Sequence, residues 1–213
     1  MKRNPNPLDI ARRVCDILIE TYQPDELEPV GKPWAYPHGL FMCSLQKLFE
    51  ETNDKRYLEY TKRWADCKID ANGEFYFKDK WFDGEKQPCF SLQLDTVQPG
   101  VPLFVLYKIY GDERYRCAIE CVYKLLKGAA TTSDGGYFHY WQSDRFSYQM
   151  WLDGLYMAEP FTMQYYLLTG KEGCLDMIWR QVRVMTEHTL DEKTGLLYHA
   201  WDESKYADHR HRQ

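Results

Sequence analysis

The chain has 213 residues, of which 44% are hydrophobic and 16% aromatic, and its formal net charge is −5. This aromatic share excludes a disordered chain, which lacks the apolar surface needed to offset the entropy lost on folding. The acidic balance argues against nucleic acid as a partner, and no apolar run approaches the roughly 20 residues that span a membrane, so we expect neither partner.

The seven cysteines are odd in number and lack CxxC or CxxH spacing. This pattern predicts reduced thiols and a cytoplasmic protein, because disulfides persist in oxidising compartments. Cys117 and Cys121 lie one helical turn apart, which favours packing over a metal site. Motifs for nucleotide binding, zinc binding and serine hydrolysis are also missing, so we expect no metal and no cofactor.

Apolar spacing predicts helices separated by short connections. In chain order they are expected at residues 7–22, 38–52, 54–68, 96–110, 112–127, 154–169 and 171–189. Helices 38–52, 96–110 and 154–169 are apolar on most faces and should be buried. The helix that follows each of them carries a charged face and should lie at the surface.

Tight turns recur between the paired helices, at Asn53, Gly111 and Gly170. Their spacing is 111 − 53 = 58 and 170 − 111 = 59 residues. Asn and Gly favour the left-handed conformation that ends a helix, and the charged residues that follow open the next one.

Short Gly-led aromatic runs follow the outer helices at residues 73–77, 136–140 and 195–199. Their alternation predicts small β-hairpins or extended loops that join one helix pair to the next.

This repeat predicts an all-α fold, an (α/α)6 toroid of helical hairpins in two concentric layers. Six hairpins of 58 residues need 6 × 58 = 348 residues, so the 213 present supply about three to three and a half hairpins. We expect residues 1–213 to form one partial barrel domain, with flexible tails at 1–6 and 206–213.

Asp95 and Asp153 lie 58 residues apart, at the starts of two inner helices. Each could serve as a helix N-cap. Both, however, follow apolar or aromatic residues, and the repeat places them on neighbouring inner helices that face one cavity. Paired carboxylates beside an aromatic-lined cavity suit acid/base chemistry on a sugar ring, so they are the candidate catalytic residues.

Aromatic residues lie in or next to the inter-helix connections: Trp34, Tyr36, Trp141, Trp151 and Trp201. They could stack on sugar rings or simply close the end of the helical core. His139 and His199 occupy equivalent repeat positions, 60 residues apart, and predict a polar cluster at the same end.

Three motifs resemble those of the unsaturated glucuronyl and rhamnogalacturonyl hydrolases, glycoside hydrolase families 88 and 105. They are QMWLDGLYM at 149–157, LDxxQPG at 94–100 and GLLYHAWDES at 195–204. The first is closer to family 105, and the similarity covers residues 30–206.

The resemblance implies an (α/α)6 barrel and an unusual hydrolysis of pectin-derived (rhamnogalacturonan) oligosaccharides. An Asp protonates C4 of a 4,5-unsaturated uronic acid, water adds at C5, and the hemiketal rearranges to release the next sugar. By this resemblance Asp153 is the acid/base, Asp95 the second carboxylate and His199 a sugar-site residue. His139 and Tyr36 match more weakly.

The chain departs from the family pattern in two places. Tyr148 stands where the family often has His, and the resemblance fades after Asp208, where the sequence turns basic. We therefore expect a truncated chain without the family's carboxylate-binding Arg.

Two alternatives stay open. One is an inactive half-toroid that binds glycan or forms homo-oligomers through its exposed apolar sides. The other is a sugar epimerase of similar fold, which the WLDGLYM run disfavours.

Overall fold

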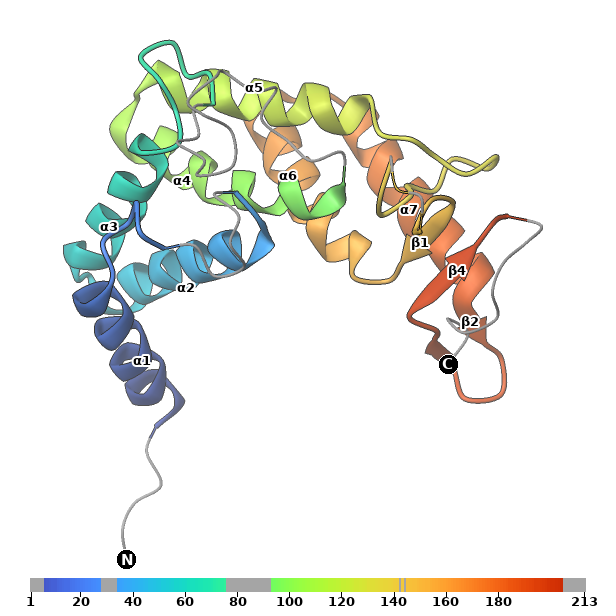
Figure 1. Ribbon diagram of the computed structural model, residues 1–213, viewed down its shortest axis with the longest axis horizontal. Helices are drawn as coiled ribbons and strands as arrows, with labels where there is room; N and C mark the ends of the chain where they lie inside the picture. The colour runs from blue at the N-terminus through green and yellow to red at the C-terminus, as the bar shows by residue number, and fades with distance from the viewer. Residues whose placement is uncertain (1–5, 28–33, 76–92, 142, 144, 205–213) are drawn as a thin grey trace, which may run out of the picture.

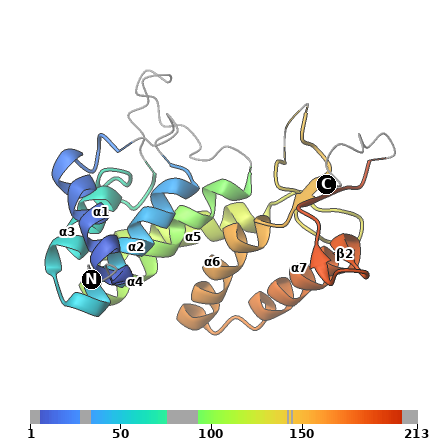
Figure 2. The same cartoon turned by 90° about the horizontal axis from the view of Figure 1, so that it is seen from below.

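The computed structural model describes residues 6–27, 34–75, 93–141, 143 and 145–204. Most of these residues are helical (Figures 1 and 2). The α-helices are α1 (Pro7–Thr21), α2 (Tyr36–Thr52), α3 (Lys55–Asp66), α4 (Val101–Tyr110), α5 (Glu113–Lys127), α6 (Gly154–Thr169) and α7 (Gly173–Thr189). The predicted helices are confirmed, most of them to within two residues at each end.

The helices form an open arc of two layers (Figure 1). Helices α2, α4 and α6 contact one another in that order and form the inner layer, and each packs against the outer helix that follows it. Helix α1 joins the outer layer beside α3, where the Tyr60 hydroxyl donates to the Tyr22 carbonyl at 3.0 Å. The predicted all-α toroid of about three and a half hairpins is thus confirmed.

The tight turns have the predicted left-handed residue, with φ of 56° at Asn53, 64° at Gly111 and 68° at Gly170. In each turn the amide of this residue donates to a carbonyl in the last turn of the helix. After the first two turns, Asp54 and Asp112 accept from the amide two residues later and so cap the next outer helix.

Neighbouring outer helices are joined by a repeated polar contact. Asp66, at the end of α3, accepts from the Tyr115 hydroxyl at 2.9 Å and from Arg114 at 3.0 Å. Asp16 of α1 receives the corresponding bonds from Tyr57 and Arg56. The same two contacts therefore join each of these outer helices to the next, and both tyrosine rings are fully buried.

Helix α4 begins later than predicted, at Val101 rather than residue 96. Two short 3₁₀ turns precede it, η1 (Leu94–Thr96) and η2 (Gln98–Gly100). Pro99 and Pro102 lack the amide hydrogens that regular α-helical bonds would need here. Asp95 therefore lies in a 3₁₀ turn that precedes α4.

Short antiparallel pairs join the hairpins, as predicted. They are the bridge Ile69↔Phe75, the bridge Thr131↔Tyr137 and the pair β2 (Leu190–Asp191) with β3 (Leu196–Leu197). Residues 76–77 of the first aromatic run lie outside the described part of the chain. A further pair joins β1 (Gln149–Trp151) to β4 (Ala200–Asp202), far apart in sequence.

Trp34 belongs to the core. Its ring is 3% exposed and stacks on Trp64 with centroids 5.1 Å apart, and its indole Nε1 donates to the Thr96 carbonyl at 2.8 Å. This placement matches the interpretation in which such a tryptophan closes the end of the helical core.

The described residues include only part of the expected tails and not all of the cysteines. The expected tails, 1–6 and 206–213, fall outside the described residues except for Asn6, whose side chain caps α1 through the Leu8 amide. The cysteines in the described part of the chain are free, and Cys89 lies outside it. No helix that is described has the length and apolar character needed to cross a membrane.

Candidate active site

The two repeat-related aspartates lie where extended segments enter the inner helices. Asp95 is in η1, ahead of α4, and Asp153 directly precedes α6. Although Asp153 occupies the N-cap position of α6, its side chain accepts no capping hydrogen bond. Asp95 bonds a histidine side chain, as described next. Helix N-capping, the usual role of an Asp at a helix start, therefore accounts for neither carboxylate.

His139 lies between the two aspartates. Its Nε2 is 3.0 Å from Asp95 Oδ1, and its Nδ1 is 4.0 Å from Asp153 Oδ1. The first distance is a hydrogen bond, whereas the second is too long for one. Nδ1 of the ring and Oδ1 of Asp153 are both buried without a partner. Rotation of Asp153 toward the ring, or one intervening water, would therefore connect the two carboxylates through the imidazole.

The main chain of His139 holds this arrangement in place. Its amide donates to the Gln149 carbonyl at 2.8 Å, and its carbonyl accepts from the Leu94 amide at 2.9 Å. One extended residue thus joins the segment that carries Asp95 to the strand that leads to Asp153. Repeat symmetry places the two aspartates on neighbouring helices, and this segment brings them to the same imidazole.

Burial differs sharply between the three side chains. The His139 side chain is 1% exposed and that of Asp95 14%, whereas 43% of the Asp153 side chain is exposed. Because Oδ1 of Asp153 is buried, the exposed area lies on the rest of its side chain. Asp153 is thus the group that solvent or a ligand reaches, and His139 and Asp95 lie behind it.

Aromatic rings form a wall beside the carboxylates. The Trp151 ring stacks on His139, with centroids 4.4 Å apart and planes at 18°. Tyr140 and Phe146 meet Trp151 edge to face, at 5.3 Å and 5.5 Å. The His199 ring also lies near Trp151, with centroids 5.7 Å apart. We call Tyr140, Phe146 and Trp151 the aromatic wall.

The hydroxyl of Tyr140, in the aromatic wall, lies close enough to both carboxyl groups to be affected by them. Burial raises the pKa of the Tyr140 hydroxyl, and the charges of Asp95 and Asp153 raise it further, with a smaller contribution from Tyr36. The hydroxyl therefore stays a neutral donor across the physiological range, within the field of both carboxylates. Tyr36, at the first position of α2, is partly exposed near it.

Sequence patterns had not marked Tyr140 and Phe146. Tyr140 directly follows His139 and belongs to the 136–140 aromatic run, so its position was a usable signal. Phe146 lies in a connection without periodicity, and only the folded structure brings it to Trp151.

Strand register separates the remaining candidates. In the β1–β4 pair, Trp151 faces Ala200, and Trp201 faces Met150. Because side chains alternate along a strand, Trp201 lies on the opposite face from Trp151. There its ring stacks on His188 of α7 at 3.8 Å. Trp141 donates to the Phe138 carbonyl at 2.9 Å and packs against the main core.

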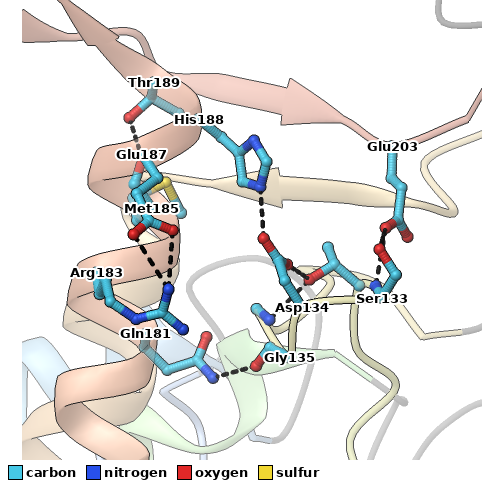
Figure 3. A network of polar contacts seen from close by, with 12 residues as sticks. Ser133, Asp134, Gly135, Gln181, Arg183, Met185, Glu187, His188, Thr189 and Glu203 are labelled. Atoms are coloured by element: carbon cyan, nitrogen blue, oxygen red, sulfur yellow. Dashed lines mark hydrogen bonds and ion pairs between the residues drawn. The ribbon is translucent and has the colours of Figure 1, made fainter.

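Polar contacts join the 132–135 turn to α7 and to Glu203, the residue that follows β4 (Figure 3). His188 Nε2 lies 2.7 Å from Asp134 Oδ2, and Glu203 accepts from both the amide and the hydroxyl of Ser133. Burial raises the pKa of Asp134, but bonds from Thr132 and His188 outweigh it and leave that pKa below the ordinary value. This network anchors β4 and the 132–135 turn to α7.

A second ionisable group lies behind the aromatic wall. Both carboxylate oxygens of Glu159 in α6 are buried without a partner. Burial raises the pKa of Glu159 to about 8. The side chain borders a cavity of about 10 Å³, also lined by Trp151, Gly154 and Gln181. This is about the size that holds one water.

A larger groove lies elsewhere. About 790 Å³ in volume, it follows the outer side of α7 and is lined by residues such as Trp179, Arg183 and Leu190. None of the residues around Asp95 and Asp153 borders it. The chemistry of the carboxylates, and not groove size, therefore identifies the candidate site.

Comparison with protein-family models identifies the family of the chain. The family model described as Glycosyl Hydrolase Family 88 matches residues 10–212. The unsaturated rhamnogalacturonyl hydrolase YesR of Bacillus subtilis (strain 168) is 26% identical over 172 residues, which cover 79% of this chain and 45% of that protein.

Solved structures agree on the fold. A family 105 glycoside hydrolase of C. acetobutylicum ATCC 824 superposes with a TM-score of 0.75 at 28% identity, covering 95% of this chain and 52% of that one. A possible family 105 member from Salmonella enterica has a TM-score of 0.70 at 16% identity, over 97% and 55% of the two chains. The chain spans about half the length of these relatives.

Proposed function

Because the chain belongs to Glycosyl Hydrolase Family 88, we propose that its Asp153 site releases a 4,5-unsaturated uronic acid from the non-reducing end of an oligosaccharide. The observation that carries the proposal is the placement of Asp95 and Asp153 on the two sides of the His139 ring. Asp153 is the exposed member of this group, and the aromatic wall stands beside it.

In the proposed reaction, the Asp153 carboxylic acid donates a proton to C4 of the enol ether. The ring oxygen stabilises the positive charge that develops at C5, and water adds there. Opening of the resulting hemiketal leaves a ketone at C5 and a hemiacetal at C1, whose collapse releases the next sugar. The bond to that sugar therefore breaks without a displacement at C1, unlike the two-carboxylate schemes of most glycosidases.

The residues behind Asp153 have a matching task. After proton transfer Asp153 is a carboxylate, and it must regain a proton from the attacking water or from solvent. His139 can relay that proton because one ring nitrogen faces Asp153 while the other is held by Asp95. Asp95 holds Nε2 of the ring, so that Nδ1 is the nitrogen that faces Asp153.

Sugar binding is assigned to the side chains on the same side as Asp153. Trp151 offers a ring face, and Tyr36 and His199 offer polar groups at the rim of the site. Trp141 and Trp201 are left out of this assignment because their rings pack against the core and against His188.

The preferred substrate is proposed to be pectin-derived, in line with the name of the relative YesR. Unsaturation between C4 and C5 removes the stereocentre that distinguishes galacturonyl from glucuronyl residues. Selectivity must then come from the sugar that is released.

This selectivity can be measured through the enol-ether absorbance. We expect the chain to consume an unsaturated rhamnogalacturonan disaccharide at least about tenfold faster than an unsaturated glycosaminoglycan disaccharide, the range that contacts to one sugar provide. Equal rates would refute the pectin assignment. If neither absorbance falls while both sugars bind, the result favours a glycan-binding protein without activity.

A further inference from the structure

Gln149 is buried at the centre of a hydrogen-bond chain that ends on the aromatic wall. Its side-chain Oε1 accepts from Trp151 Nε1 at 3.0 Å, and its Nε2 donates to Asp202 Oδ2 at 3.2 Å. Its carbonyl accepts from the His139 amide. One residue therefore touches the stacking tryptophan, the bridging histidine and a fixed carboxylate, and it is 6% exposed.

The orientation of the Gln149 amide follows from its partners. An indole nitrogen can only donate, and an ionised carboxylate can only accept. The amide must therefore direct its oxygen at Trp151 and its nitrogen at Asp202. Asp202 is itself held, since it lies directly across the β1–β4 pair and its Oδ1 accepts from the Ser204 amide at 2.8 Å.

The orientation of Trp151 matters because its ring is stacked on His139. The imidazole has one polar bond, to Asp95, and its other nitrogen has no partner within hydrogen-bond distance. This one hydrogen bond does not define the plane of the buried imidazole, and the stacked indole does.

We propose that Gln149, fixed by Asp202, is a positioning residue that sets the Trp151 ring and, through it, the His139 ring between the two aspartates. The inference rests on the proposed function for its kinetic consequence, but the geometry that it predicts can be measured without substrate. Gln149 and Asp202 form the anchor pair of the site.

The test is a polarity swap across the anchor pair. Gln149→Glu places a carboxylate against Asp202, and the two charges repel. Adding Asp202→Asn restores every bond. The amide introduced at position 202 donates to the carboxylate introduced at position 149 and accepts from the Ser204 amide, while that carboxylate accepts from Trp151. The double variant has the net charge of the parent.

We expect Gln149→Glu to lower kcat on the unsaturated rhamnogalacturonan disaccharide by about 10- to 100-fold, the effect of a misplaced catalytic group. The double variant should return to within about threefold of the parent, since the two changes compensate. Gln23→Glu adds the same charge at an exposed site where the new carboxylate can still accept from Arg63, and it should leave kcat unchanged.

The second readout is the indole Nε1–H resonance of Trp151, assigned by its loss in Trp151→Phe. It should shift and lose exchange protection in Gln149→Glu and recover in the double variant. Wild-type kcat in Gln149→Glu, or no recovery in a folded double variant, would overturn the inference. If the chain consumes no unsaturated sugar, the proposed function fails, and an unmoved Trp151 resonance in Gln149→Glu would separately overturn the positioning role.

Discussion

Replacing Asp153 with asparagine should lower kcat on an unsaturated uronyl disaccharide by about 10²- to 10⁴-fold, the usual contribution of general acid catalysis. Asparagine keeps the volume and polarity of the side chain but has no acidic proton to give to C4. KM should change little, because the aromatic wall and the rim residues remain.

The structure makes Asp153→Asn a clean test. The Asp153 side chain accepts no capping bond and its buried Oδ1 has no hydrogen-bond partner, so its replacement breaks no capping bond and none at Oδ1. Its thermal unfolding should match that of the parent. Asp176→Asn, on the exposed surface of α7, is the matched control and should retain full activity. A wild-type kcat in Asp153→Asn would remove Asp153 from the role of proton donor.

Replacing Glu159 with glutamine should stabilise the protein, and the gain should grow with pH. The folded-state pKa of Glu159 is raised to about 8 from an ordinary value of 4.5. Between these two values the unfolded chain has released the proton that the folded chain retains. The stability of the parent therefore falls as pH rises from about 5 to 8, by about 1.4 kcal/mol per pH unit at most.

Glutamine does not titrate, so the difference in unfolding free energy between Glu159→Gln and the parent should be small near pH 5. It should reach a few kcal/mol near pH 8 and then level off. The same region shifts a second group: burial and Glu159 both raise the pKa of Tyr137, while Arg180 lowers it.

Urea unfolding at pH 5, 6.5, 8 and 9 measures this difference. Glu192→Gln removes an exposed carboxylate and should give a difference near zero at every pH. A stability gain in Glu159→Gln that stays constant across this range would show that Glu159 does not titrate there.

Much of the fold was predictable because local features of the sequence, namely backbone preferences and apolar spacing, mark each repeat. Asn53, Gly111 and Gly170 end helices through their own backbone preference, and apolar spacing alone separates inner from outer helices. The late start of α4 was also within reach, since Pro99 and Pro102 remove the amide hydrogens that a regular helix would use there.

Only the part of the site that follows the helical repeat was predictable from the sequence. Symmetry placed Asp95 and Asp153 on neighbouring inner helices, and the fold gives them a common neighbour in His139. The faces of Trp151 and Trp201 depend on a strand pair between segments about 50 residues apart, and a shift of one residue in register would exchange them. Such register cannot be read from either segment alone.

The role of Gln149 could not be predicted, because it also depends on the β1–β4 strand pair. It belongs to a motif that the sequence singled out, but its importance comes from Asp202 across the strand pair and from the ring of Trp151. Phe146 joins the site through a ring contact with Trp151 that no local sequence pattern marks, whereas Tyr140 directly follows His139 and also contacts Trp151.

Hydration of the double bond is tested most directly by comparing an unsaturated rhamnogalacturonan disaccharide with its saturated counterpart on the same chain. We expect the enol-ether absorbance of the first to fall in step with release of its second sugar, and the saturated disaccharide not to be cleaved. Release of sugar from the saturated compound at a similar rate, or release from the unsaturated one with its absorbance retained, would contradict hydration of the double bond by the Asp153 site.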